Sequence, residues 1–337
     1  MRKFLLLLLL FCLLLPTSLL ACKDEEVDPY PPVARTADES RVVMKVGSYD
    51  VYYDQFRALY LQYKNLYGED DAAIKAALTA DLVEFYALFS LAEKKGIDVW
   101  GETMNKAVVA GVKRLIEGDV EFAGYGSYEN YKKSIKESGM TDATVRLQLR
   151  ADAVRAELLH RLKNDGTVKS DDETLAAFLL SDDCVRVQYI YVEESAYYYK
   201  GSFDELAYSA TLEAASTALL DTTDDNFVLQ MTKYAPTMNR AVDQYISRYS
   251  IDAPYTGVGD AAFSLTVGGT QAISYGSLGR VYFLRRAESA AFADVDREVL
   301  AAVYDTHALG ELIAAEGETM TVTTTELYNS VTPETVK

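Results

Sequence analysis

Residues 184–194 read CVRVQYIYVEE. Apolar and polar side chains alternate along part of this run, and Val185, Val187 and Val192 are β-branched, which is typical of a β-strand with a buried face. Most of the chain before this run shows helical spacing of its apolar residues instead. The run therefore predicts that a sheet begins at Cys184, in the middle of an otherwise helical protein.

The segment that follows continues this pattern with few strands and interleaved helices. An alanine-rich helix is expected after Ser202, and GRVYFLRR, residues 279–286, alternates as a second clear strand. Strands mixed with helices in a short segment are typical of a small α+β domain. We therefore expect such a domain over residues 184–289.

The segment before the strand, residues 41–183, is expected to be a helical domain. Its first long helix carries five aromatic residues, spaced three, four, three and four apart: Tyr53, Phe56, Tyr60, Tyr63 and Tyr67. This spacing places the rings on one face of the helix. The stripe is either part of the core or part of a hydrophobic groove that binds unfolded peptide, and the spacing fits both.

The segment after the α+β domain, residues 290–337, returns to a helical pattern and then reaches the β-branched run TMTVTTTELY, residues 319–328. We expect this last strand to pair with Val42–Val46 near the start of the helical domain. The expected fold class is therefore mainly α with an α+β insert, in which the N- and C-terminal parts of the chain build one helical domain.

The first residues, MRKFLLLLLLFCLLLPTSLLAC, have a basic start and a long apolar run, which indicates a secretory signal. The ending LLAC resembles the lipobox of bacterial lipoproteins, so residues 1–21 are expected to be removed and Cys22 to carry the lipid. Residues 22–40 are charged and contain proline, and we expect them to form a flexible tether. The expected location is extracytoplasmic, with lipid anchoring to a bacterial membrane.

The composition excludes several classes of function. A net charge of −18 argues against nucleic acid as a partner. The two histidines, His160 and His307, have no metal-ligating residue at a useful spacing, so no metal is expected. No phosphate-binding loop, dinucleotide fingerprint or nucleophile elbow occurs, and no cofactor is expected.

Several motifs resemble extracytoplasmic foldases of the PrsA and SurA type. KVGSYDVYYDQF, residues 45–56, looks like the strand, turn and helix start of that family, and ALFSLAEKKGIDV, residues 87–99, looks like the end of its second helix. AAFSLTVGG and GRVYFLRR look like the closing half of its parvulin-type peptidyl-prolyl isomerase domain. The resemblance implies a helical chaperone domain, a parvulin-like insert, and unfolded or nascent secreted polypeptides as partners.

The same resemblance assigns site residues and also departs from the family pattern. The first family histidine falls on Tyr189 and the second on Val281, so Tyr189 is the candidate catalytic residue. Val258 and Val281 join the aromatic stripe as candidates for peptide binding. Because both histidine positions are replaced, the expected function is a chaperone with weak or lost isomerase activity. An active prolyl isomerase and a non-catalytic envelope scaffold or ligand-binding lipoprotein remain as alternatives.

Overall fold

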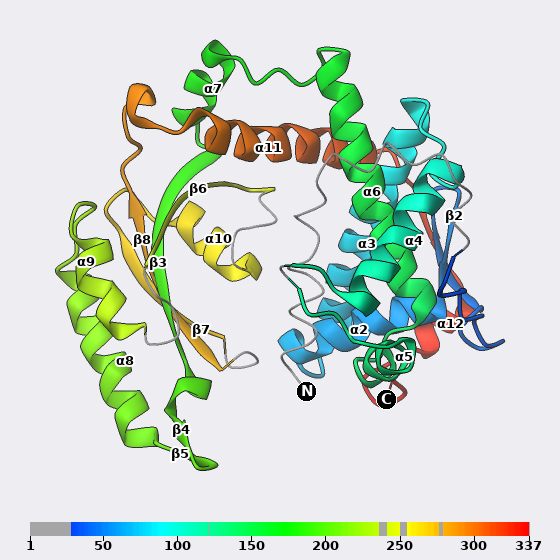
Figure 1. The fold of residues 1–337 in the computed structure, drawn as a ribbon, viewed down its shortest axis with the longest axis horizontal. Helices are drawn as coiled ribbons and strands as arrows, with labels where there is room; N and C mark the ends of the chain where they lie inside the picture. The colour runs from blue at the N-terminus through cyan, green and yellow to red at the C-terminus, as the bar shows by residue number, and fades with distance from the viewer. Residues whose placement is uncertain (1–27, 121, 236–240, 250–254, 276–278, 337) are drawn as a thin grey trace. The chain divides into compact units, whose positions relative to one another are not determined.

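The structure is a computed structural model that describes residues 28–120, 122–235, 241–249, 255–275 and 279–336. The chain divides into two compact units, with unit 1 formed by Met1–Asp165 and Leu312–Lys337 and unit 2 by Gly166–Glu311. Helices dominate unit 1, and unit 2 combines a sheet with helices (Figure 1). The predicted fold class, mainly α with an α+β insert, is confirmed.

Unit 1 is a set of long helices beside a small sheet. Its elements are β1 (Val42–Val46), β2 (Tyr49–Tyr52), α2 (Tyr53–Tyr67), α3 (Asp71–Lys94), α4 (Glu102–Glu117), α5 (Tyr128–Glu137), α6 (Asp142–Asn164), the end of α11 (Arg297–Gly317), β9 (Val322–Thr324) and α12 (Glu326–Ser330). Helix α6 begins at a capping box, in which Thr141 and Thr144 satisfy each other's backbone N–H groups. Helix α3 supplies much of the core, through Leu78, Leu82 and Phe89.

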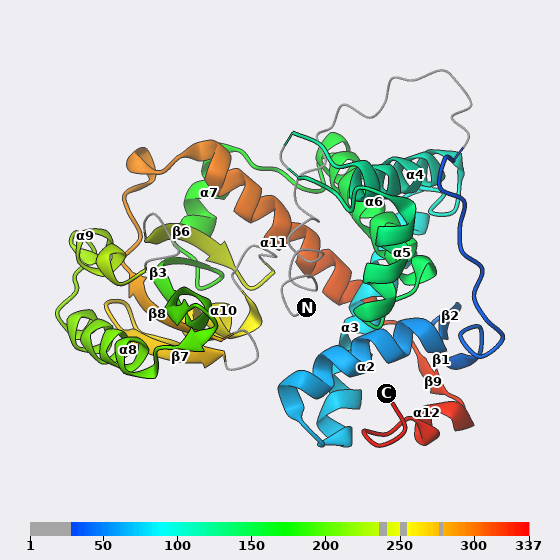
Figure 2. The same ribbon diagram turned by 60° about the horizontal axis from the view of Figure 1, so that its bottom comes forward.

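The small sheet of unit 1 joins the two ends of the chain. Its strand order is β2, β1, β9 (Figure 2). Strand β9 pairs antiparallel with β1, and Lys45 lies opposite Thr323. Gly47 forms the tight turn between β1 and β2 at a φ of 56°, which favours glycine. The predicted pairing of the last strand with Val42–Val46 is confirmed.

Residues 28–40 lie against helices of unit 1, which contradicts the expected tether over this range. Asp28 forms an ion pair with Arg146 at 3.0 Å, and the backbone N–H of Val33 donates to Asp142 at 3.0 Å. Arg35 pairs with the fully buried side chain of Asp54 at 2.8 Å. Polar partners on the helices hold this segment, which the composition alone could not reveal. We call residues 28–40 the N-terminal strap.

Unit 2 is built around a four-stranded antiparallel sheet with the strand order β6, β3, β8, β7. Helices α8 and α9 cover one face of this sheet, and α10 covers the other (Figure 1). Its elements are α7 (Asp172–Leu179), β3 (Cys184–Glu193), η2 (Glu194–Tyr197), β4 (Tyr198–Tyr199), β5 (Ser202–Phe203), α8 (Glu205–Leu220), α9 (Phe227–Met231), η3 (Thr232–Tyr234), β6 (Val242–Ser247), α10 (Tyr255–Ser264), β7 (Thr270–Tyr275), β8 (Arg280–Ala287), η4 (Phe292–Asp294) and the first part of α11.

The boundaries of unit 2 lie outside the predicted limits of 184 and 289. Leu175 and Phe178 of α7 form one buried cluster with Cys184 of β3 and Leu300 of α11. Because α7 and the first part of α11 bury their apolar faces with the start of the first strand, they belong to unit 2. The helical spacing of α7 and α11 had instead indicated that they belong to the helical domain.

Within the described residues, no helix combines the length and apolar character needed to cross a bilayer.

Lys94, Ser90 and Glu316 form a polar contact within unit 1. Lys94 Nζ lies 2.7 and 2.6 Å from the two carboxylate oxygens of Glu316, and Ser90 Oγ donates to Oε1 at 2.6 Å. Burial alone would raise the pKa of the Glu316 carboxyl, but these hydrogen bonds and the Lys94 charge outweigh burial and lower that pKa. The contact therefore stabilises the fold while Glu316 is ionised.

Replacing Glu316 by glutamine is expected to lower the free energy of unfolding of unit 1 by about 1–2 kcal/mol at pH 7. The contribution is present above the ordinary pKa of 4.5 and is lost as the pH falls through the lowered folded-state value. Urea unfolding followed by the fluorescence of Trp100, the only tryptophan and a residue of unit 1, measures the effect. A difference between variant and parent that is as large at pH 3 as at pH 7 would contradict this assignment.

Candidate peptide-binding site

The α10 face of the unit 2 sheet holds Tyr189, the candidate catalytic residue. Val185, Val187 and Tyr189 alternate onto this face of β3, where they form one buried cluster with Val258 of α10. Only 8% of Tyr189 is exposed. The candidate thus sits inside an apolar cluster rather than at an open catalytic surface.

The aromatic neighbour of Tyr189 is Tyr282 on β8. Their ring centroids lie 6.2 Å apart, and Tyr282 is 1% exposed. Desolvation lowers the pKa of Arg280, but its hydrogen bond with the Tyr282 phenol contributes to a net rise in that pKa. Arg280 also lies over the ring of Tyr191 and pairs with Glu193 at 3.1 Å. The phenols and this arginine supply hydrogen-bond donors to the face, beside apolar side chains.

Val281, the predicted second histidine position, lies on the opposite face of the sheet. It packs against the cluster formed with α8 and α9, together with Ile190 and Phe283. Tyr189 and Val281 therefore cannot act together on one ligand. The residue that shares the face of Tyr189 is Tyr282, one position further along β8.

Three of the other predicted peptide-binding residues are buried. Phe56 and Tyr60 of α2 and Val258 of α10 are each 0% exposed, so they serve as core residues. Tyr53 and Tyr63 are half-buried, and the Tyr63 hydroxyl donates a short hydrogen bond to Asp81. The stripe was interpreted as either core or peptide-binding groove, and the burial of Phe56 and Tyr60 supports the core interpretation for these two residues.

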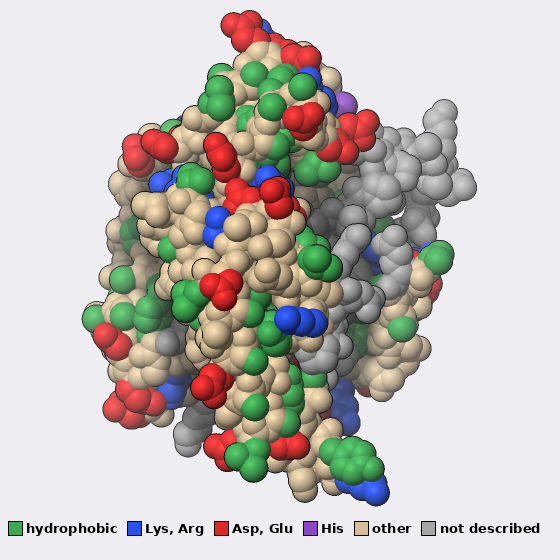
Figure 3. Space-filling view, turned by 90° about the vertical axis from the view of Figure 1, so that its left-hand side faces the viewer, with side chains coloured by type: hydrophobic (Ala, Val, Ile, Leu, Met, Phe, Trp, Pro, Cys, Tyr) green, Lys and Arg blue, Asp and Glu red, His purple; other side chains and the backbone are tan. Residues whose placement is uncertain are grey.

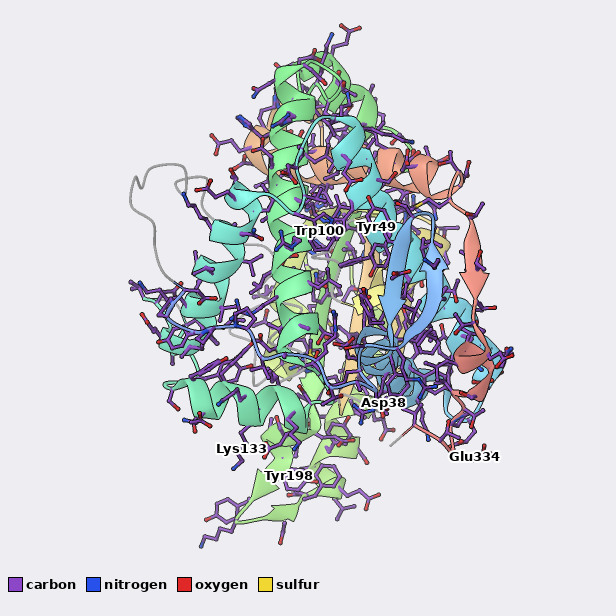
Figure 4. All side chains as sticks on the ribbon, turned by 90° about the vertical axis from the view of Figure 1, so that its right-hand side faces the viewer. Asp38, Tyr49, Trp100, Lys133, Tyr198 and Glu334 are labelled. Atoms are coloured by element: carbon purple, nitrogen blue, oxygen red, sulfur yellow. The ribbon has the colours of Figure 1, made fainter. Side chains whose placement is uncertain are left out.

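Exposed aromatic side chains gather instead at the short hairpin β4–β5. Tyr198 is 55% and Tyr199 72% exposed, and the rings of Tyr198 and Phe203 lie 5.2 Å apart. Lys200 and Gly201 form the turn at positive φ values of 50° and 84°, as a two-residue hairpin requires. We call Tyr198, Tyr199 and Phe203 the aromatic hairpin; its end lies at the bottom of Figure 3, and Figure 4 labels Tyr198.

Ring contacts attach the aromatic hairpin to the body of unit 2. Phe203 lies 5.5 Å from Tyr208 of α8, and Tyr208 lies 5.3 Å from Tyr197. Asp204 caps α8 by accepting from the backbone N–H of Ala207. The cap fixes the start of α8. The aromatic hairpin, which contacts Tyr208 of this helix, therefore has a defined position on unit 2.

Sequence reasoning missed Tyr282 and the role of Phe203. The alternation in GRVYFLRR does place Tyr282 and Leu284 on one face, but the face they share with Tyr189 depends on the β3–β8 register. The role of Phe203 was not predicted, because the run SFDE, residues 202–205, is typical of a helix start. Cys22, the predicted lipidation site, lies outside the described residues.

Comparison with known proteins gives matches among solved structures alone. No family model matches the chain, and no curated protein matches it. The foldase protein PrsA from Streptococcus pneumoniae is 18% identical, with 80% of this chain and 90% of that chain covered and a TM-score of 0.29. PrsA from Bacillus subtilis is 14% identical, with 83% and 93% covered and a TM-score of 0.24.

A further match is a structure from Campylobacter jejuni. Its description names the virulence factor PEB4 and the periplasmic protein Cj1289 as two structurally related SurA-like chaperones. It is 9% identical, with 85% of this chain and 99% of that chain covered and a TM-score of 0.29. The chain is thus similar, over most of its length and at low identity, to PrsA foldases and to a SurA-like chaperone.

Proposed function

We propose that the protein is an extracytoplasmic chaperone of the foldase type, which holds unfolded secreted polypeptides and has weak or no prolyl isomerase activity. The observation that carries this proposal is the aromatic hairpin of unit 2, where large rings lie in solvent. Its support from the sequence is the motif resemblance described above.

Exposed tyrosine and phenylalanine side chains suit loose binding of unfolded chains. Each ring offers a large apolar area and loses little conformational entropy on binding, and the tyrosine hydroxyl can remain in water. Unfolded segments expose apolar side chains that such rings can cover. Because the contacts need no fixed sequence, the hairpin would bind many clients weakly.

Anchoring through lipid on Cys22 would hold this activity close to the membrane. The N-terminal strap fixes Asp28 to Arg146 on unit 1, and the chain from Cys22 to Asp28 reaches at most about 20 Å when extended. If Cys22 carried the lipid, Asp28, where the strap joins the helices of unit 1, would therefore remain within this distance of the anchor. Such a position suits the capture of polypeptides that emerge at the membrane.

The surroundings of Tyr189 support the proposal of weak or absent isomerase activity. Rotation about an X-Pro bond faces a barrier of about 18–20 kcal/mol, and a catalyst must favour the twisted amide. Tyr189 and Tyr282 are both buried, and their cluster consists of apolar and tyrosine side chains. An active prolyl isomerase is the alternative, and it would accelerate the refolding of a proline-limited substrate.

Replacing all three residues of the aromatic hairpin by serine is expected to abolish most of the suppression of client aggregation. Residues 23–337 of the parent should suppress aggregation of an unfolded client at near-stoichiometric ratio. The serine variant should need several times more protein, because the exposed rings that cover the client are gone. Light scattering of a chemically unfolded client, diluted into buffer, measures this.

The matched control replaces Leu220 and Leu229, which are 77% and 83% exposed elsewhere in unit 2, by serine. This control removes exposed apolar area but leaves the hairpin intact, so it should keep the parental suppression. Equal loss of aggregation suppression in both variants would mean that any exposed apolar surface binds the client. No suppression by the parent would reject the chaperone role. Binding of one defined ligand without suppression would favour the scaffold or ligand-binding alternative.

A further inference from the structure

Unit 1 contains a cavity of about 420 Å³ that is distinct from the aromatic hairpin. It lies between the β1–β2 hairpin, α3, the turn before α4, and α6. Its lining includes Tyr49, Trp100 and Leu147 together with three arginines, Arg35, Arg146 and Arg150. Figure 4 labels Trp100 and Tyr49, which lie near each other between α6 and the β1–β2 hairpin. This volume lies in the range of small-ligand sites.

Neighbouring rings hold the aromatic wall of the cavity in place. Tyr49 stacks on Tyr86 with centroids 5.1 Å apart, and its hydroxyl donates to Glu93 at 2.8 Å. Trp100 packs edge-on against Phe89 at 5.7 Å and remains 50% exposed. The wall is therefore preorganised and keeps ring surface available for a ligand.

Two of the three arginines already have carboxylate partners. Arg35 pairs with Asp54 at 2.8 Å, and Arg146 pairs with Asp142 at 2.8 Å and with Asp28 at 3.0 Å. The carboxylate of Asp50, also in the lining, faces Lys45 at 2.7 Å. These charges are balanced within the protein and leave little attraction for an added anion.

Arg150 differs because its hydrogen bonds go to neutral oxygens. It donates to the carbonyl of Val99 at 2.7 Å and to Asn105 Oδ1 at 2.5 Å, and its guanidinium lies 4.8 Å from the centre of the Trp100 ring. Among the described residues no carboxylate lies within ion-pair distance of it, and burial lowers its pKa although the more distant Asp98 opposes this. A partly desolvated guanidinium beside an exposed ring favours a ligand carboxylate.

We propose that this cavity binds a short polypeptide segment in which an aromatic side chain adjoins a carboxylate. The aromatic ring would lie against Trp100 and Tyr49, and the carboxylate would accept hydrogen bonds from Arg150. Two sources can supply this chemistry, an aspartate or glutamate side chain and the carboxyl terminus of a peptide. The site does not involve the aromatic hairpin, so either can fail while the other holds.

Trp100 allows a direct test because it is the only tryptophan of the chain. The whole chain, in a non-ionic detergent, is titrated with N-acetyl-Phe-Glu-amide, with N-acetyl-Phe-Gln-amide and with N-acetyl-Phe as the free acid. We expect saturable changes of Trp100 emission, with the Glu peptide binding about tenfold more tightly than the Gln peptide. Saturation by N-acetyl-Phe instead of the Glu peptide would assign the site to chain termini.

Replacing Arg150 by glutamine is expected to remove the preference for glutamate over glutamine while the fold is kept. Arg155, on the same helix and outside the cavity lining, provides the control Arg155→Gln, which should keep the preference. Circular dichroism and thermal unfolding check that both variants are folded. Equal affinity of the parent for all three probes, or no saturable change with any of them, would overturn the proposal.

Discussion

Replacing Asp142 by alanine is expected to lower the free energy of unfolding of unit 1 by about 3–5 kcal/mol. Its side chain is 1% exposed and accepts three hydrogen bonds, from the backbone of Val33 at 3.0 Å, from the Tyr131 hydroxyl at 2.8 Å and from Arg146 Nε at 2.8 Å. Alanine would leave a buried phenol without its acceptor. It would also leave Arg146 with one carboxylate instead of two.

The same change is expected to release the N-terminal strap, because Asp142 holds Val33 and positions Arg146 against Asp28. Urea unfolding followed by Trp100 measures the stability, and tryptic cleavage after Arg35 measures the release. Asp142→Asn keeps one oxygen acceptor and should cost less. The control Asp38→Ala removes an exposed ion pair with Arg41 and should cost below about 1 kcal/mol. Equal stability of Asp142→Ala and Asp38→Ala would show that the strap contributes little.

The ordered N-terminal strap could not be predicted from the sequence. Tyr30 and Val33 are its only large apolar residues, too few to form a periodic pattern. Most of the contacts that order the segment are single polar ones, and some join residues more than a hundred positions apart, such as Val33 with Asp142. Elements with strong periodicity, including α2 and β3, were predicted because each buries apolar side chains at the spacing of its secondary structure. The pairing of β9 with β1 was predicted from β-branched composition at both ends of the chain.

The candidate site was predicted less well because its residues depend on strand register. Tyr189 and Val281 come from strands about ninety positions apart, and a shift of one residue moves a side chain to the other face of the sheet. The observed register places Tyr189 opposite Leu284 and Tyr191 opposite Tyr282. The aromatic stripe of α2 posed a different problem, because a core and a binding groove have the same spacing. Burial in the fold was needed to separate them.

Replacing Tyr282 by alanine is expected to lower the free energy of unfolding of unit 2 by about 3–5 kcal/mol, as for other large buried side chains. The ring is 1% exposed and contacts Tyr189 and Tyr191, with centroids 6.2 and 5.4 Å away. Removing it leaves a cavity between the sheet and α10 that the β-strands cannot close. Tyr282→Phe keeps the ring and should cost about 1 kcal/mol through the lost hydroxyl contact.

The thiol of Cys184 reports this loss within unit 2. Its burial raises its pKa to about 12 and keeps it unreactive in the folded state. In a chain with Cys12 and Cys22 replaced by serine, Tyr282→Ala should therefore speed thiol labelling strongly, whereas Tyr282→Phe should change it little. Trp100 fluorescence should show that unit 1 remains folded. Slow labelling of Tyr282→Ala, equal to that of the parent, would contradict a packing role for this ring.

Replacing Tyr189 by phenylalanine distinguishes a packing role of Tyr189 and Tyr282 from a catalytic role of the Tyr189 phenol. If the two tyrosines act through packing, this variant keeps the fold, and neither it nor the parent accelerates the refolding of a proline-limited substrate. If the parent does accelerate refolding and Tyr189→Phe reduces that rate, the phenol takes part in isomerisation and the chaperone proposal must include an active site. We expect the first result, because a proline ring could reach Tyr189 only after the buried cluster beneath α10 had opened, and that opening exposes apolar surface to water.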